Sequence, residues 1–280
     1  MHAASRPLTS RTLRAAAASY RRGTPVPRGP TGRVDLTDLL ADPYADPADA
    51  ERRLALTERR LFDAGDRRAV FLTVYGTVTS RVRRGLASDR FADPEWVGAY
   101  LTAFANRYRT ALSAYECGER DRVPRAWRLA FDAALAGDTL VTQDALLGIN
   151  AHVVHDLALA LVDVGVHPKP ARRADHDAVN AILAELVDVE QDLLAARYAP
   201  GLADLDEAGG RIDEAAAFLT LAEGRDWAWH CAVALADGGP LARRTVRWLL
   251  DRVSAGAGRL VLAPSRYGGA RDRLLALERS

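Results

Sequence analysis

The chain has 280 residues, 49% of them hydrophobic, and a formal net charge of +1 at pH 7. This is enough apolar material for a real core, and the balanced charge excludes a general attraction to nucleic acid or to a membrane. Cys117 and Cys231 form no CxxC pair, no uninterrupted apolar run reaches the roughly 18 residues of a membrane helix, and no signal-peptide core is present. A cytoplasmic protein without a disulfide framework is expected.

Residues 1–33 predict a flexible basic tail. They carry seven arginines and no acidic residue, and they contain the helix-breaking run "GTPVPRGPTG". A basic arm for a partner or a nucleic acid is the alternative. From residue 34 to residue 280 the pattern is that of one helical domain.

The helices are predicted in chain order from their caps and their apolar spacing. A helix over 46–65 begins at a capping Asp46 and stops at Gly65. The segment 66–86 is apolar at every fourth residue, but its β-branched content leaves a strand open. Asp93 and Pro94 open the next helix, to residue 116. Further helices are expected over 123–137, 148–165, 175–201, 212–239 and 241–258. No alternating strand pattern and no repeat is visible, so an all-α single-domain bundle is predicted.

The segment "GINAHVVHDLALALVDVG" (148–165) predicts a buried central helix, because it is apolar nearly all round. On a wheel of about 100° per residue, Asp156 and Asp163 fall within about 40° of His152, and His155 lies about 60° away. Buried carboxylates and imidazoles without partners cost several kcal/mol. This strip therefore predicts a polar cavity in which the groups satisfy one another, bind a metal ion or do chemistry.

Residues i and i+4 of a helix lie one above the other, so His152 and Asp156 have two possible uses. They can hydrogen-bond each other, with Asp156 fixing the imidazole tautomer, or they can bind one cation together. A satisfied structural pair remains open as well.

Other candidates follow downstream. His176 stands at the start of the expected next helix with Asn180 one turn later, and its neighbours Asp175 and Asp177 resemble helix caps. The cluster "RDWAWHCA" supplies Arg225, Trp229 and His230. For each of these residues a packing or hydrogen-bonding role is an open alternative.

Most of the chain resembles a family of uncharacterised bacterial and archaeal proteins. The segments that carry the resemblance are "LLGINAHVVHDLALAL", "FADPEWVGAYLTAFANRYRTAL", "VPRAW" and "DHDAVNAIL", and it spans residues from about 40 to 235. It implies a common fold and no particular activity.

A shorter stretch, "AHVVHD", is similar to the "HYxxD" helix of the zinc-dependent phospholipase C and P1-type nuclease family. His152 and Asp156 match its His and Asp, and His176 stands 24 residues after His152, as a further family His does. Asn180 replaces the family's Glu, and Val162 replaces another His. The resemblance implies one divalent ion, zinc, held by His152, Asp156 and His176, or a metal-free cavity descended from such a site.

The leading functional prediction is a metal-dependent hydrolase of a small-molecule ester or phosphoester. His155 or His230 would be its proton shuttle and Arg225 its anion clamp. The first alternative is a metal-free acid/base catalyst or cyclase built on His152 and Asp156. The second is a non-enzymatic helical binding protein.

In the metal-free alternative, an apolar cavity would be lined by aromatic and amide side chains. These are Tyr75, Trp96, Trp127, Trp229 and Asn180. No nucleotide-cofactor motif is present in the sequence, and the oligomeric state is left open.

Overall fold

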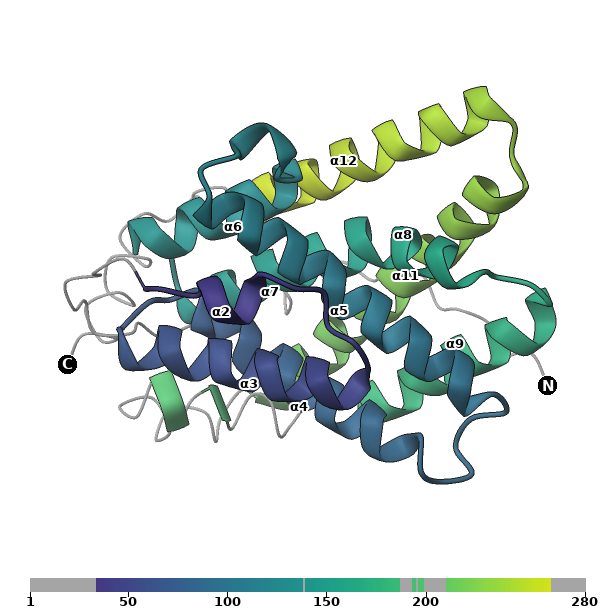
Figure 1. The fold of residues 1–280 in the computed structure, drawn as a ribbon, viewed down its shortest axis with the longest axis horizontal. Coiled ribbons are helices and arrows are strands. Elements are labelled where there is room, and N and C mark those ends of the chain that lie inside the picture. The colour runs from purple at the N-terminus through teal and green to yellow at the C-terminus, as the bar shows by residue number, and fades with distance from the viewer. Residues whose placement is uncertain (1–33, 138, 187–192, 195, 199–209, 263–280) are drawn as a thin grey trace.

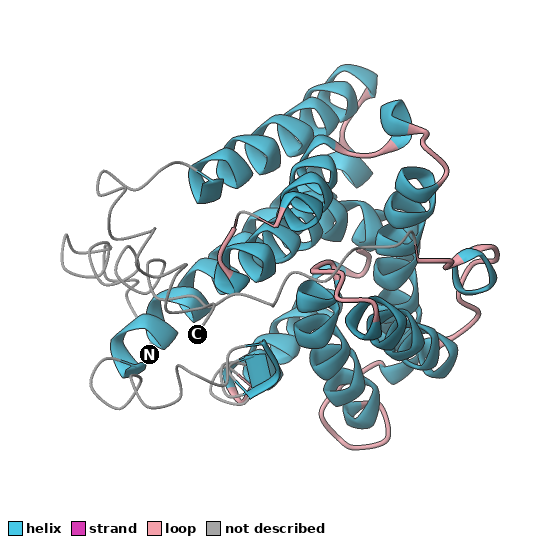
Figure 2. Cartoon of the chain, turned by 90° about the vertical axis from the view of Figure 1, so that its left-hand side faces the viewer, coloured by secondary structure: helices cyan, strands magenta, loops and turns pink. Residues whose placement is uncertain are grey.

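The computed structural model describes residues 34–137, 139–186, 193–194, 196–198 and 210–262, with the backbone alone over 210–220. Within this part of the chain every regular element is a helix (Figure 2), so the all-α prediction is confirmed. The predicted basic tail, residues 1–33, lies outside the described residues. The helices are α2 (Thr37–Leu40), α3 (Pro47–Asp63), α4 (Ala69–Gly85), α5 (Pro94–Glu116), α6 (Arg125–Ala136), α7 (Val141–Asn150), α8 (Leu157–Val164), α9 (Lys169–Ala184), α11 (Gly210–Asp237) and α12 (Pro240–Leu262).

Local capping chemistry sets several of these boundaries. The carboxylate of Asp46 accepts a hydrogen bond from the Asp49 backbone N–H at the start of α3, and that of Asp93 accepts one from Trp96 at the start of α5. Both acceptors satisfy N–H groups that have no partner within their own helix. Gly137 ends α6 with a φ of 65°, a left-handed conformation that favours glycine.

The segment 66–86, for which a strand was left open, is helical as α4. Helix α9 also differs from its prediction, because it begins at Lys169 and not at Asp175. The connection left between the helices predicted over 148–165 and 175–201 is therefore shorter, because residues 169–174 belong to α9. Pro168 caps α9 and Pro170 stands in its first turn, where a missing N–H costs no helical hydrogen bond. The expected end of this helix, beyond Leu186, falls largely outside the described residues.

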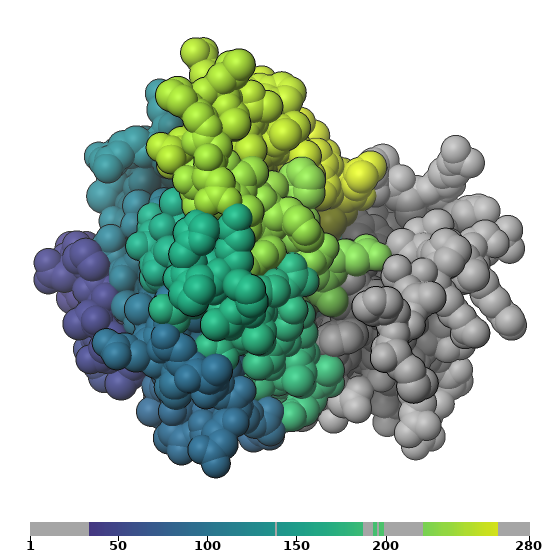
Figure 3. Space-filling model, turned by 90° about the vertical axis from the view of Figure 1, so that its right-hand side faces the viewer, coloured from purple at the N-terminus to yellow at the C-terminus, as the bar shows by residue number. Residues whose placement is uncertain are grey.

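The segment Val141–Val164 runs through α7, a turn of π-helix (Ala151–Asp156) and α8 without a break. It packs against α4, α5, α6, α11 and α12. In Figure 1 it lies between α5 and the long α12. Figure 3 shows the molecule from the right-hand side of Figure 1. In this view α8 and α9 lie between the turn that joins α11 to α12 and the start of α5.

Two hydrophobic clusters form the core, and this segment contributes to both. Val141, Leu147 and Ala151 belong to the first cluster, together with residues of α2 to α6. Leu157 and Leu161 belong to the second, together with residues of α5, α9, α11 and α12. The π turn therefore lies where the segment passes from one cluster to the other.

The sequence was expected to contain no membrane-length segment. By length and composition alone Val141–Val164 could cross a membrane, with a mean hydropathy of 1.6 over its most apolar window. Core helices pass the same test, and 56% of that window is buried within the protein. The observation is weak evidence for a membrane.

Candidate functional site

A turn of π-helix holds the candidate site. The backbone N–H of Leu157 bonds to the carbonyl oxygen of His152, five residues earlier, where an α-helix would close over four. Such turns are rare and occur frequently at functional sites. This one places His152, His155 and Asp156 in a single wide turn.

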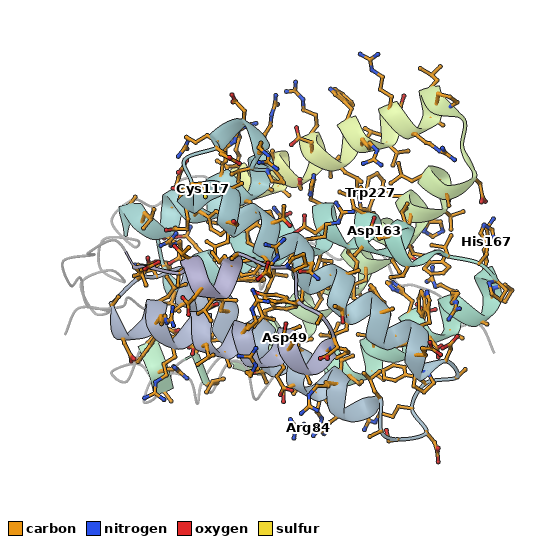
Figure 4. The ribbon with its side chains drawn as sticks, viewed as in Figure 1. Asp49, Arg84, Cys117, Asp163, His167 and Trp227 are labelled. Carbon is orange, nitrogen blue, oxygen red and sulfur yellow. The ribbon has the colours of Figure 1, made fainter. Side chains whose placement is uncertain are left out.

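The turn also explains a wrong prediction. Asp163 was expected on the buried strip with His152, but it lies on the surface of α8, where Arg107 Nε donates to its carboxylate at 3.1 Å (Figure 4). The π turn takes up one residue more than an α turn does. Every residue after it is therefore turned by about 100° from its place on a regular wheel.

Asp156 is the centre of a buried hydrogen-bond network. Its Oδ2 accepts from Trp127 Nε1 at 2.7 Å and faces His152 Nδ1 at 3.2 Å, and its Oδ1 faces His155 Nδ1 at 2.8 Å. An ionised carboxylate only accepts, so both histidines donate from Nδ1. Burial acts to raise the pKa of Asp156, but the bonds from His152 and His155 outweigh it and hold that pKa at about 2.

His152 is enclosed by rings. Its imidazole stacks on Phe104 with centroids 3.5 Å apart and meets the edge of Tyr75 at 4.4 Å. Burial lowers the pKa of His152 against the opposing effect of Asp156, so the ring is neutral. Its Nε2 is buried and has no hydrogen-bond partner among the described residues.

His155 differs from His152 because it reaches a surface hollow. Its side chain is 12% exposed, against 2% for His152. The hollow has a volume of about 310 Å³. With Nδ1 held by Asp156, the nitrogen that remains for a molecule in this hollow is Nε2.

Three of the eight residues that line the hollow around His155 are arginines. They come from the turn of 3₁₀-helix Arg120–Arg122 that follows α5 and from the first turn of α6. Cys117, at the end of α5, marks this corner of the molecule in Figure 4. The lining residues are Asp121, Arg122, Val123, Pro124, Arg125, Arg128, His155 and Asp251. The hollow therefore combines a held imidazole with guanidinium groups, which suit an anionic ligand.

His176 belongs to a different cluster. Its Nδ1 accepts from Tyr100 Oη at 3.2 Å and faces Arg225 Nη2 at 3.4 Å, and its Nε2 donates to the Arg225 carbonyl oxygen at 3.3 Å. Burial, followed by the charge of Arg225, holds the pKa of His176 well below 6.5. Both nitrogens of this neutral ring therefore have partners, and neither partner is His152 or Asp156, the other two predicted zinc ligands.

Arg225, Asn180 and Asp175, the other polar residues around His176, make hydrogen bonds that connect helices. Arg225 Nε donates to Asn180 Oδ1 at 2.6 Å, and its Nη2 donates to the His176 carbonyl oxygen at 2.7 Å. These bonds tie α11 to α9. Asp175 accepts from the backbone N–H groups of Ala92 and Asp93, so it serves the start of α5 and not its own helix.

Three other predicted site residues, Trp96, Trp229 and His230, have their contacts elsewhere in the protein. Trp229 packs on His176 with centroids 5.4 Å apart, and Trp96 Nε1 donates to the Gly165 carbonyl oxygen. His230 is 68% exposed and its Nδ1 faces the Asp226 carbonyl oxygen at 2.8 Å. Trp127 and Tyr75 contact His152 and belong to the first core cluster. Trp96 and Trp229 belong to the second cluster.

The predicted metal set is not assembled. Within the described ranges, no three or more His, Cys, Asp or Glu side chains are grouped so that they could hold a metal ion. His152 and Asp156 lie together, as predicted, but His176 lies with Tyr100 and Arg225 instead.

Sequence reasoning missed the arginines of the hollow and the ring of Phe104. The run "RDRVPRAWR" carries four arginines directly before and within the first turns of α6, and this density was the available signal. Phe104 was noted only as part of an apolar helix face.

Comparison with known protein families gives a match over most of the chain. The profile described as "Family of unknown function (DUF5995)" matches residues 48–264. No curated protein and no solved structure matches significantly.

Proposed function

The chain belongs to this family of unknown function, DUF5995, and from that premise we propose that it is an enzyme in which His155, oriented by Asp156, performs acid/base catalysis on a small anionic substrate. One observation carries the proposal. The partly exposed imidazole of His155 lines an arginine-rich hollow while its Nδ1 lies 2.8 Å from a buried carboxylate.

Asp156 is the positioning residue. Its carboxylate stays ionised, since its pKa is about 2, and it selects the His155 tautomer with the proton on Nδ1. It also stabilises the imidazolium that forms when Nε2 takes up a proton. Trp127 and His152 hold the other carboxylate oxygen, so the orientation of Asp156 is fixed from three sides.

The substrate class follows from the arginines. Planar guanidinium groups bind phosphate and carboxylate with two parallel hydrogen bonds. Arg128 has only a weak bond to the Arg120 carbonyl oxygen, at 3.3 Å, so its charge can be turned to a ligand. A phosphoester is the class that we favour.

The proposed reaction is hydrolysis. His155 Nε2 takes a proton from water as the water oxygen attacks phosphorus, and the bond from phosphorus to the alcohol oxygen breaks. The imidazolium then gives that proton to the departing alkoxide oxygen, so that the alcohol is released and His155 is neutral again. Arg128 would hold the phosphoryl oxygens and stabilise their charge, and Arg122 would join it by leaving its exposed pair with Glu119, now at 2.6 Å.

The test uses p-nitrophenyl phosphate and bis(p-nitrophenyl) phosphate as probes of monoester and diester hydrolysis. We expect His155→Gln to lower kcat by about 10²–10⁴-fold, the usual contribution of a positioned acid or base. His230→Gln is the matched control, because His230 is exposed on α11, away from the hollow. Hydrolysis of neither probe would sink the phosphoester class, and full activity in His155→Gln would sink the assignment of His155.

The zinc-dependent hydrolase implied by the phospholipase C and P1 nuclease motif is a second proposal. Only the buried Nε2 of His152, which has no described partner, favours it. His176, its third ligand, would have to leave Tyr100 and Arg225. Metal analysis of protein purified without a histidine tag tests it, and less than one zinc per chain would reject it.

A further inference from the structure

A second hollow adjoins the one that contains His155. It has a volume of about 360 Å³ and is lined by Arg120, Arg125, Arg128, Leu129, Asp132 and Arg259. Arg125 and Arg128 line both hollows. They stand three residues apart on α6, on one helix face and about 5–6 Å from each other at their Cβ atoms. The two hollows are therefore neighbours on either side of one arginine ridge.

The charges of the two hollows favour an anion in each. Their walls together carry five arginines against Asp121, Asp132 and Asp251. Three of the five are paired: Arg125 with Asp251 at 3.2 Å, Arg120 with Asp132 at 2.6 Å, and Arg122 with Glu119, outside the walls, at 2.6 Å. Such exposed pairs contribute little to stability, so they can open to admit a ligand.

Arg259 differs from Arg120 and Arg125, because no carboxylate lies within ion-pair distance of it among the described residues. It stands in the last turn of α12 and lines the second hollow but not the first. In Figure 1 this end of α12 lies beside α6 and the turn before it. A cation of α12 thus faces the cations of α6 across the second hollow.

We propose that the two hollows bind one small molecule with two phosphate groups. The first phosphate lies beside His155, and the second lies between the Arg125–Arg128 ridge and Arg259. This deepens the proposed function by naming a bisphosphorylated or oligophosphorylated substrate. The reaction of the first phosphate rests on the proposed function, whereas the binding of the two phosphates does not.

Calorimetry with inorganic phosphate and with tripolyphosphate tests the proposal on the full chain, without any need for turnover. Two linked anion sites raise the effective concentration of the second group, so tripolyphosphate should bind at least about tenfold more tightly than phosphate. Arg259→Gln should weaken tripolyphosphate binding by about tenfold, as expected for the loss of a charge-assisted contact. It should weaken phosphate binding by less than about twofold, because phosphate can still bind in the hollow beside His155, which Arg259 does not line.

The matched control is Arg244→Gln, an exposed arginine of the same helix that lines neither hollow. Equal effects of the two variants, or equal affinities for the two probes, would overturn the proposal. Tighter binding of a single-stranded oligonucleotide, with a steep loss in salt, would replace it with a nucleic-acid surface. If tripolyphosphate binds as expected but no phosphoester is hydrolysed, the site stands and the proposed function fails.

Discussion

Trp127 and His152 meet at one carboxylate oxygen. The Trp127 indole donates to Asp156 Oδ2 at 2.7 Å, and His152 Nδ1 faces the same atom at 3.2 Å. All three side chains are buried. The carboxylate therefore keeps its charge inside the core through donors from α6 and from its own helix.

Trp127→Phe should destabilise the protein through this bond. Phenylalanine keeps most of the apolar contact and removes the donor, and a hydrogen bond to a charged group contributes about 1.5–3 kcal/mol. Urea unfolding measures the difference. Trp248→Phe is the control, because Trp248 is 56% exposed on α12 and such surface changes stay within about 0.5 kcal/mol. Equal losses in the two variants would contradict the role of the bond.

A double-mutant cycle should show that His152 and Asp156 are coupled. Asp156→Leu leaves the donors of Trp127, His152 and His155 unpaired, and removal of one partner of a buried pair costs about 3–5 kcal/mol. His152→Leu with Asp156→Leu should cost less than the sum of the single changes, by about 0.5–3 kcal/mol. Additive losses would show that the two side chains do not interact.

Stability should fall as the pH drops below 6.5. The folded-state pKa of His152 and of His176 is lowered from 6.5, so below that pH the unfolded chain binds protons that the folded chain does not. Each histidine then removes up to about 1.4 kcal/mol of unfolding free energy per pH unit. Asp156 acts in a lower window, between its ordinary pKa of 3.8 and its folded value of about 2.

The variant that tests this pH dependence is His176→Gln. Its unfolding free energy between pH 6.5 and 5.5 should fall less steeply than that of the wild type, by the contribution of one histidine. His230→Gln, at an exposed position, should keep the wild-type slope. An unchanged slope in His176→Gln would mean that this ring takes up its proton equally in the folded and the unfolded protein, and would contradict the lowered pKa.

Two helical glycines should respond in opposite directions to alanine. A Cβ on Gly148 would lie 2.4 Å from the Phe71 ring and 2.7 Å from the Phe71 Cβ, too close for the ring to move aside. A Cβ on Gly76 meets nothing within 4 Å. Gly76→Ala should raise the melting temperature, because alanine gains about 0.5–1 kcal/mol in a helix, and Gly148→Ala should lower it. A rise in both would show that α4 and α7 do not pack closely here.

The helices could be predicted from the sequence because their signals are local. Asp46, Asp93 and Gly137 fix helix ends through groups within a few residues of themselves, and the structure has them in those roles. The start of α9 was placed too late, because its prolines were interpreted as a loop although the first turn of a helix tolerates them.

The candidate site was predictable in part. The spacing of His152 and Asp156 correctly indicated a buried pair, since i and i+4 meet within one helix. The π turn could not be predicted, because its five-residue closure depends on the helices packed around it, and the wheel therefore misplaced Asp163. The spacing of 24 residues between His152 and His176 did not determine the distance between the two side chains, because a turn between α8 and α9 separates them.

The π turn also sets a limit on how the chain can vary. Deletion of Val153 or Val154 would let the backbone return to four-residue closure. Because the π turn takes up this one extra residue, the deletion would leave α8 in its present orientation, with Leu157 and Leu161 still in the second core cluster. The hydrophobic interior thus does not need the surplus residue, whereas the spacing of His152, His155 and Asp156 does, and a shortened chain would keep its fold and lose this turn.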